Sequence, residues 1–301
     1  MQTGPTVTVI TPFFNVAPYL AEAIESVLAQ TFEEWELVLV DDSSTDGGRA
    51  IADGYAERHS DRITVVAHPG GANRGISASR NLGRRHARGT WLASLDGDDV
   101  WVSTKLSDQM AIAAAHPEVG LIMGASRYWS SWADGAGSAE DRIVSVGAPQ
   151  DSVVPPPLLL DLLYPLGRGA APSMNTVLVR ADLVDQVGGW EDDFRTGYED
   201  QAFLAKLYLE TSTYVASACW DLYRQRPGSV SVLDLREDGY DKHRRQFLEW
   251  YETYLIRRNL TRAPVWRSLQ RALRHYRHPF VARIERKARG ALRRLAALAG
   301  G

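Results

Sequence analysis

The 301-residue chain contains one cysteine, Cys219, and no long uncharged apolar run. A single cysteine excludes an internal disulfide framework, and without a Cys-x-x-Cys pair or a Cys/His cluster the sequence offers no zinc site. A membrane-spanning helix needs about 18 or more consecutive apolar residues, so none is expected. The first residues also lack a basic stretch followed by an apolar run, so we expect no signal peptide and a cytoplasmic protein.

Two common phosphate-binding patterns are also missing. Gly70-Gly71 is not followed by Gly-Lys-Ser/Thr, which excludes a P-loop, and no Gly-x-Gly-x-x-Gly fingerprint of a dinucleotide-binding dehydrogenase occurs. The composition is otherwise that of a soluble globular protein with a buried core, because 45% of the residues are hydrophobic and 24% are charged.

The net charge of −3 conceals an uneven distribution. From Arg257 to the C-terminus there are 13 Lys/Arg and one acid, whereas the preceding chain has 21 Lys/Arg and 36 Asp/Glu. Pro279–Leu298 reads as a basic amphipathic helix, which can lie on an anionic membrane or dock against the acidic body or a second subunit. We leave these alternatives open and expect no nucleic-acid binding, since no recognised binding motif is present.

Short apolar runs alternate with amphipathic stretches over the first 125 residues, which predicts βαβ units and a mostly parallel sheet flanked by helices. The predicted strands are Thr6–Thr11, Glu36–Asp41, Ile63–Ala67, Thr90–Leu95, Asn175–Arg180 and Tyr214–Ala218. The predicted helices are Tyr19–Gln30, Asp46–His59, Ile76–Arg88, Val102–His116, Asp182–Val187, Asp200–Glu210 and the chain after Gly239. Ala133–Pro157 has no clear period and is predicted to be an irregular excursion.

Unusual polar residues follow these strands, where parallel sheets bind their ligands. Asp96, Asp98 and Asp99 come after the fourth strand, and such closely spaced carboxylates suit Mg²⁺ or Mn²⁺ or else form a solvated acidic turn. Asp41 and Asp42 follow the second strand and could accept hydrogen bonds from a nucleobase and ribose.

Two further segments carry charged residues that could take part in the reaction or could have only a structural role. Arg80 could bring a positive charge to a phosphate, or it could be a surface arginine of an amphipathic helix. Glu199 and Asp200 could supply a general base, or they could be first-turn acids that stabilise a helix.

Taken in order, these segments resemble the family 2 glycosyltransferases over about residues 6–230. The GT-A fold of that family is a Rossmann-like, mostly parallel central sheet flanked by helices. The matching motifs are Val7–Asn15, Thr31–Glu36, Val40–Gly47, Asn73–Gly83, Leu95–Trp101 and Gly188–Leu207.

The resemblance implies an inverting, metal-dependent transfer of a sugar from a nucleotide diphosphate, most often UDP, to the hydroxyl of a glycan, lipid-linked or small-molecule acceptor. Asp200 would be the base, with Glu199 beside it. The metal, Mn²⁺ or Mg²⁺, would lie on Asp98 or Asp99. The residues implied to bind the nucleotide sugar are Pro12, Phe14, Asn15, Asp42, Arg80, Asp96, Arg224 and Arg226.

The chain departs from the family's pattern at two positions. Phe14 stands where tyrosine is frequent, and Arg226 stands where the family often carries histidine. Arginine cannot ligate a metal, so we hypothesise that Arg226 or Arg224 steadies the diphosphate instead.

We expect a transferase domain over residues 1–230, with an acceptor-side excursion at 133–172, and a basic helical extension over residues 231–301. The expected role is cell-surface polysaccharide, glycolipid or secondary-metabolite synthesis, with peripheral attachment to the inner membrane face as one option. The alternatives are a sugar-nucleotide nucleotidyltransferase and an inactive nucleotide-sugar binding or scaffold protein.

Overall fold

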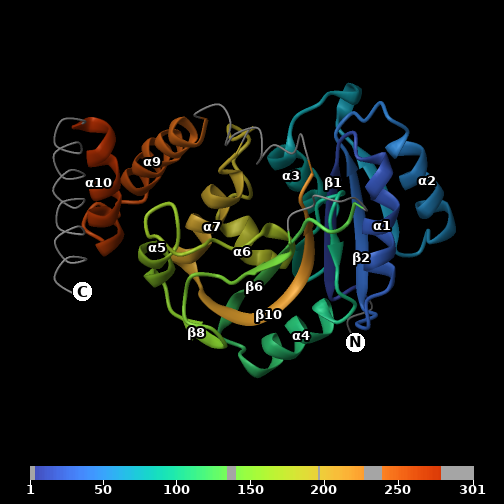
Figure 1. Cartoon of the computed structure of the whole chain (residues 1–301), viewed down its shortest axis with the longest axis horizontal. Coiled ribbons are helices and arrows are strands. Elements are labelled where there is room, and N and C mark those ends of the chain that lie inside the picture. Colours follow the sequence, from blue (N-terminus) through green and yellow to red (C-terminus); the bar gives the residue numbers. More distant parts are fainter. Residues whose placement is uncertain (1–3, 134–139, 196, 227–238, 279–301) are drawn as a thin grey trace. The chain divides into compact units, whose positions relative to one another are not determined.

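The computed structural model describes residues 4–133, 140–195, 197–226 and 239–278 (Figure 1). The chain divides into two compact units, residues 1–237 and residues 238–301. The sequence-based boundary stood at residue 230. The larger unit is built on one curled sheet with helices on both faces, which confirms the predicted α/β class.

The first half of the sheet is parallel, as the sequence pattern predicts. Its strands lie in the order β3-β2-β1-β4. β1 and β2 are buried along their whole length, which explains their nearly continuous apolar runs, because strands covered on both faces have no polar side. The four strands are β1 Val7–Phe13, β2 Trp35–Asp41, β3 Ile63–Ala67 and β4 Trp91–Ser94.

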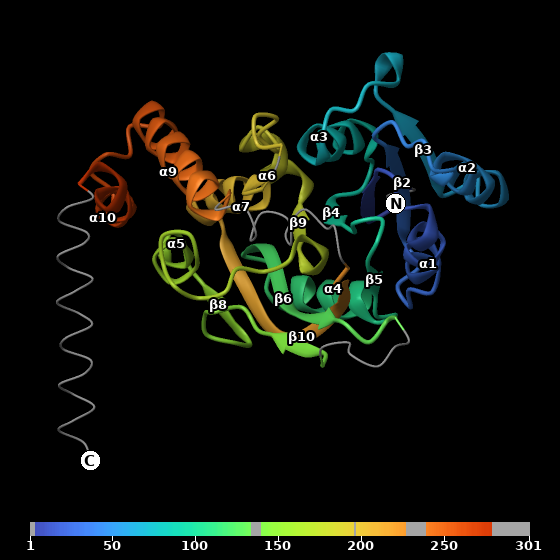
Figure 2. The same ribbon diagram turned by 45° about the horizontal axis from the view of Figure 1, so that its top comes forward.

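Helices cover the two faces of this half-sheet separately (Figure 2). α1 (Ala17–Leu28) and α2 (Gly48–Arg58) pack together on one face and contribute to the main hydrophobic core. α3 (Ile76–His86) packs on β1 and β2 from the other face. Its approach is very close, since a Cβ added at Gly83 would lie 2.4 Å from Cγ2 of Ile10.

The second half of the sheet is mixed, whereas the first half is parallel throughout. β9 runs antiparallel to both β4 and β6, while β6 and β10 are parallel to each other. The remaining helices of this unit include α4, whose Leu106 joins the main core. The elements are β5 Val100–Trp101, α4 Lys105–Ala115, β6 Val119–Trp129, α5 Leu158–Leu162, η2 Met174–Thr176, β9 Leu178–Arg180, α6 Ala181–Gln186, α7 Glu199–Glu210 and β10 Ser212–Arg224.

The segment predicted to be irregular contains two short strands. β7 (Arg142–Val144) pairs with β6, and β8 (Ser152–Val154) pairs with β10. Residues 134–139 lie outside the described part. A strand of three residues has too few positions for an alternating pattern, so only pairing with a neighbour identifies it.

The first unit also contains a short 3₁₀ helix, η1 (Pro69–Gly71). The second unit is helical where it is described. α9 (Gly239–Arg257) packs against α10 (Pro264–Arg277), and both carry buried apolar stripes. The buried side chains are Phe247, Leu248, Tyr251, Leu255, Val265, Leu269 and Leu273. The predicted basic helix 279–298 falls outside the described residues. Among the described residues, no helix has the length and apolar character needed to cross a bilayer.

Candidate active site

The carboxyl ends of three parallel strands bring the predicted donor-side residues to one edge of the sheet. Phe13 at the end of β1 is paired with Asp41 at the end of β2, and Ile10 of β1 is paired with Ser94 of β4. The chain therefore leaves β2 toward Asp42 and β4 toward Asp96 on the two sides of β1.

Asp42 is buried and its carboxylate already has partners. Its two oxygens accept hydrogen bonds from the backbone N–H groups of Arg74 (2.7 Å) and Gly75 (2.8 Å). Asn73 donates to its carbonyl oxygen at 3.0 Å. These contacts hold the loop before α3 against the end of β2, so the structure gives Asp42 a positioning role in addition to any base contact.

The turn after β1 presents an exposed aromatic ring. Phe14 is 46% exposed, whereas the neighbouring Pro12 is buried in β1. Asn15 adopts a left-handed conformation with φ of 52°, and its side-chain oxygen accepts a hydrogen bond from the N–H of Thr45 at 2.8 Å. An exposed ring in the turn at this edge of the sheet is a surface on which a planar base can stack.

The acidic turn after β4 is held by an asparagine that the sequence analysis missed. The side-chain oxygen of Asn175 accepts from the N–H of Asp96 (2.9 Å), and its amide donates to Oδ2 of Asp99 (2.6 Å). Asn175 is fully buried in η2, about 80 residues further along the chain. No local sequence pattern links the two segments, so only the tertiary structure could reveal this contact.

Asp99 differs from the expected metal ligand. It is 1% exposed, and its second oxygen accepts from the N–H of Arg224 at 2.7 Å. Burial is also the main reason why the pKa of Asp99 is raised well above its ordinary value. Both oxygens are thus engaged inside the protein, and Asp99 fastens the acidic turn to the end of β10.

Arg80 connects this acidic turn with α7. Its Nη2 donates to Oδ1 of Asp96 at 2.7 Å, and its Nη1 lies 4.0 Å from Oε1 of Glu199. The side chain is 1% exposed, and Nε donates to Ser94. Arg80 thus sets the two acids beside one site, and its contact with a donor phosphate stays a prediction.

The two predicted base-side acids begin α7. Burial, followed by repulsion from Asp200, raises the pKa of Glu199 to about 7. Burial also raises the pKa of Asp200, although the N–H of Gln201, which donates to Oδ1 at 2.7 Å, opposes the shift. Carboxylates with raised pKa values are better proton acceptors near neutral pH than ordinary carboxylates.

Two arginines meet the acidic turn from the end of β10. Nε of Arg224 donates to the carbonyl oxygen of Asp98 at 2.8 Å, and Nε of Arg226 donates to Oδ2 of Asp98 at 2.7 Å. The side chain of Asp98 is 20% exposed and that of Arg226 is 24% exposed. Arg226 therefore lies where the sequence motif places a divalent cation.

The three aspartates of the acidic turn, as they are paired in this structure, do not fit a divalent ion. Asp96 is paired with Arg80, Asp98 with Arg226, and Asp99 is occupied by amide donors. Across the described ranges, no three His, Cys, Asp or Glu side chains gather into a group that could hold a metal. A cation would have to displace a guanidinium from Asp98 before it could bind there.

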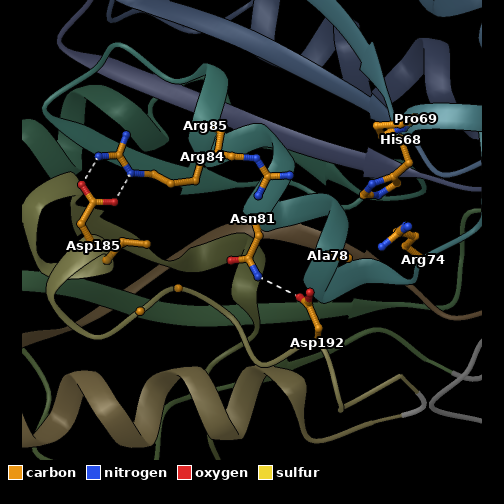
Figure 3. A pocket seen from close by; sticks show the side chains of 12 residues that line it. His68, Pro69, Arg74, Ala78, Asn81, Arg84, Arg85, Asp185 and Asp192 are labelled. Atoms are coloured by element: carbon orange, nitrogen blue, oxygen red, sulfur yellow. Dashed lines mark hydrogen bonds and ion pairs between the residues drawn. The ribbon is translucent and has the colours of Figure 1, made fainter.

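A cavity of 570 Å³ lies beside α3 (Figure 3). Asn81 and Arg84 of α3 line it together with Asp185 and Asp192, and Figure 3 shows the pairs Asn81–Asp192 and Arg84–Asp185 across it. The predicted catalytic acids do not line this cavity, so we do not place the reaction there.

Asn81 clamps the late acidic motif to α3. Its side-chain oxygen accepts from the N–H of Trp190 (2.9 Å) and its amide donates to the carbonyl of the same residue (2.8 Å). A Cβ at Gly189 would lie 2.4 Å from that oxygen, which explains the glycine. Both Asn81 and the Gly188-Gly189-Trp190 motif were part of the sequence analysis. No local pattern in the sequence predicted that they contact each other.

Comparison with known proteins agrees with this geometry. The model of "Glycosyl transferase family 2" matches residues 8–138, which contain the first three strand-end segments. Residues 8–138 belong to glycosyltransferase family 2. EpsE of Bacillus subtilis, named as a candidate glycosyltransferase, is 42% identical over 116 residues, which are 38% of this chain and 41% of EpsE.

A second relative has a name that states its reaction. WfgD of Escherichia coli, a UDP-Glc:α-D-GlcNAc-diphosphoundecaprenol β-1,3-glucosyltransferase, is 32% identical over 106 residues, 35% of this chain and 40% of that protein. This chain thus spans about two fifths of the length of either relative.

Two solved structures share the GT-A fold. Staphylococcus aureus TarS 1–349 in complex with UDP-GlcNAc gives a TM-score of 0.58 at 22% identity, covering 81% of this chain and 66% of that one. The mannosyltransferase PcManGT of Pyrobaculum calidifontis, in complex with GDP-Man and Mn²⁺, gives 0.57 at 19% identity over 97% and 81% of the two chains.

Proposed function

We propose that this family 2 glycosyltransferase moves a sugar, with inversion, from a nucleotide diphosphate to an acceptor hydroxyl, and that UDP-sugars are the first donors to test. The observation that carries the proposal is the Arg80 bridge. It sets Asp96, at the donor-side strand ends, beside Glu199 at the start of α7, so donor-side and base-side acids border one site.

In the proposed reaction Asp200 accepts the proton of the acceptor hydroxyl. The freed oxygen attacks the anomeric carbon of the sugar from the face opposite the diphosphate. The new carbon–oxygen bond forms as the bond from that carbon to the phosphate oxygen breaks, and the nucleoside diphosphate leaves with the bonding electrons. Burial raises the pKa of Asp200, which strengthens it as a base.

On the donor side, the exposed ring of Phe14 would stack on the base, and the loop that Asp42 holds would complete that pocket. Arg226 would face the diphosphate just beyond the end of β10, and the enclosed Arg224 would add positive charge behind the acidic turn. The Mn²⁺ in the mannosyltransferase complex supports a requirement for a divalent cation in this protein too. The pairing of Asp98 with Arg226 argues against such a requirement. The metal requirement stays a prediction of the motif.

For the acceptor, the name of WfgD supports a lipid-linked intermediate of a cell-surface polysaccharide. We propose an acceptor of this class, which the excursion at residues 133–172 would contact. The basic C-terminal segment would bind an anionic membrane surface on the cytoplasmic side. An acidic surface of a second subunit is the alternative partner for that segment.

A donor screen tests the proposal. The full chain is incubated with UDP-, GDP- and dTDP-sugars, with Mn²⁺ or with EDTA, and free nucleoside diphosphate is measured. We expect slow hydrolysis of one donor class and its loss in Asp200→Asn. Pyrophosphate exchange would instead indicate a nucleotidyltransferase, and binding without turnover of any donor would indicate an inactive nucleotide-sugar binding protein.

A further inference from the structure

The end of β10 supplies two guanidinium groups to one aspartate. Arg224 and Arg226 both use Nε to contact Asp98, the first at the carbonyl oxygen (2.8 Å) and the second at Oδ2 (2.7 Å). A guanidinium fixed through Nε still has its terminal N–H groups available for other partners. The two arginines differ in how those terminal groups are used.

The guanidinium of Arg224 is enclosed. Its carbon lies 4.4 Å from the ring centre of Trp129, 4.9 Å from that of Tyr19 and 5.1 Å from that of Trp132. Its side chain is 3% exposed, and Nη2 is paired with Glu22. Cation–π contacts of this kind hold a guanidinium in one orientation, so Arg224 is a fixed positive charge behind the acidic turn.

Arg226 is the more open of the two. One quarter of its side chain is exposed, and its terminal nitrogens have no hydrogen-bond partner among residues 4–133, 140–195, 197–226 and 239–278. Its only ring contact in that part of the chain is Tyr19, at 5.6 Å. Arg226 can therefore neutralise Asp98 through Nε and still donate two or more hydrogen bonds outward.

We propose that Arg226 takes the place of the divalent cation at Asp98 and binds the diphosphate of the donor directly. The inference rests on the proposed function and concerns how the same site meets the diphosphate. A guanidinium can bridge a carboxylate and a phosphate, because its donors are arranged in a planar fork that suits both. Binding of a metal ion at Asp98 would be less favourable, since the ion must break the Arg226–Asp98 pair and then lie beside a positive charge.

The test is equilibrium binding of UDP to the full chain, measured by calorimetry in EDTA and in excess Mn²⁺, with GDP and dTDP in parallel. We expect wild-type affinity to change by less than about threefold between the two conditions. Arg226→Ala should bind at least about tenfold more weakly in EDTA, because a charge-assisted contact is lost. Its affinity should recover in Mn²⁺, which can then reach Asp98.

Two further variants separate the role of charge from that of folding. Arg226→Lys should keep part of the binding in EDTA, whereas Arg226→His should make binding respond to Mn²⁺, because imidazole beside a carboxylate is a metal donor. Arg58→His, on the exposed surface of α2, is the matched control and should behave as wild type. Thermal unfolding of each variant identifies any that fail to fold.

Each outcome has a defined consequence. A wild-type protein that binds UDP, GDP or dTDP only in the presence of Mn²⁺ overturns the inference and leaves the proposed function standing. So does an Arg226→Ala variant with unchanged affinity in EDTA. A wild-type protein that binds none of the three nucleotides in either condition overturns the proposed function and this inference with it.

Discussion

At the scale of single residues, the site depends on a few side chains that each serve two segments. Arg80 is the clearest case, because one guanidinium contacts the turn after β4 and the first residue of α7. Asn175 and Asn81 act in the same way through amide groups. Each of the three contacts segments about 80 to 120 residues apart in the chain.

Arg80→Met should therefore cost stability as well as turnover. Removing one partner of a buried ion pair typically costs about 3–5 kcal/mol, because the remaining acids lose their compensation. Arg84→Met is the control from the next turn of α3, since its partner Asp185 is 61% exposed and such a pair contributes about 1 kcal/mol or less. Urea unfolding of both variants measures the difference, and equal losses would contradict the bridging role.

Asp200→Asn should abolish most turnover without weakening the binding of donor. A general base typically contributes about 10²- to 10⁴-fold to a rate, and the amide cannot accept the acceptor's proton. Donor hydrolysis and UDP calorimetry on the same preparation check the two halves of the prediction. Turnover within a few-fold of wild type would remove Asp200 from the role of base.

Glu199 should make the stability of the protein depend on pH. Its pKa is raised from 4.5 to about 7, so the folded protein retains a proton that the unfolded chain has already released. Stability is consequently highest below the ordinary pKa and falls as pH rises toward 7, by about 3 kcal/mol at most. In Glu199→Gln this fall should largely disappear, which urea unfolding between pH 4 and pH 8 would reveal. An unchanged slope would contradict the raised pKa.

At the scale of elements, the placement of α3 on the sheet governs the site, because α3 carries Arg80 and Asn81. The helix can approach β1 only where it lacks a side chain, and Gly83 provides that position. The last glycine of the Asn73–Gly83 motif thus has a packing role, which the sequence pattern alone could not distinguish from a turn.

Gly83→Ala should destabilise the protein, whereas Gly54→Ala should not. The added Cβ at Gly83 would meet Ile10 at 2.4 Å, and overpacking a core typically costs about 1–3 kcal/mol. At Gly54, within α2, the nearest atom would be an arginine terminus at 3.6 Å, so alanine should stabilise the helix by about 0.5–1 kcal/mol. Thermal unfolding of the two variants should shift in opposite directions, and equal shifts would contradict the packing argument.

At the scale of the whole molecule, the uneven charge predicts an interaction of the C-terminal segment. Replacing Arg286, Lys287, Arg293 and Arg294 with glutamine in the full chain should reduce co-sedimentation with anionic vesicles, because each basic residue near such a surface adds about 1 kcal/mol. Neutral vesicles and the wild-type chain are the controls. Equal pelleting of the two proteins would exclude the membrane, and sedimentation velocity would then test the second-subunit alternative.

The local pattern of the sequence was sufficient to predict the elements of the parallel half-sheet and the acids at the ends of its strands. Apolar runs and helical spacing are properties of neighbouring residues, so β3 was predicted to the residue and α7 to within one. The antiparallel β9, the short β7 and β8, and the mixed half of the sheet depended on pairing between distant segments, which no local pattern encodes.

The sequence by itself determined that this is an α/β protein with carboxylates at the strand ends, because periodicity and residue type carry that information, and the order of its motifs resembles that of family 2. Only the tertiary structure decided which charges meet. It joined Arg226 to Asp98 and Arg80 to both Asp96 and Glu199, and it buried Asp99 among amide donors. Electrostatic pairing depends on distances in space, and these are set by how the whole chain packs.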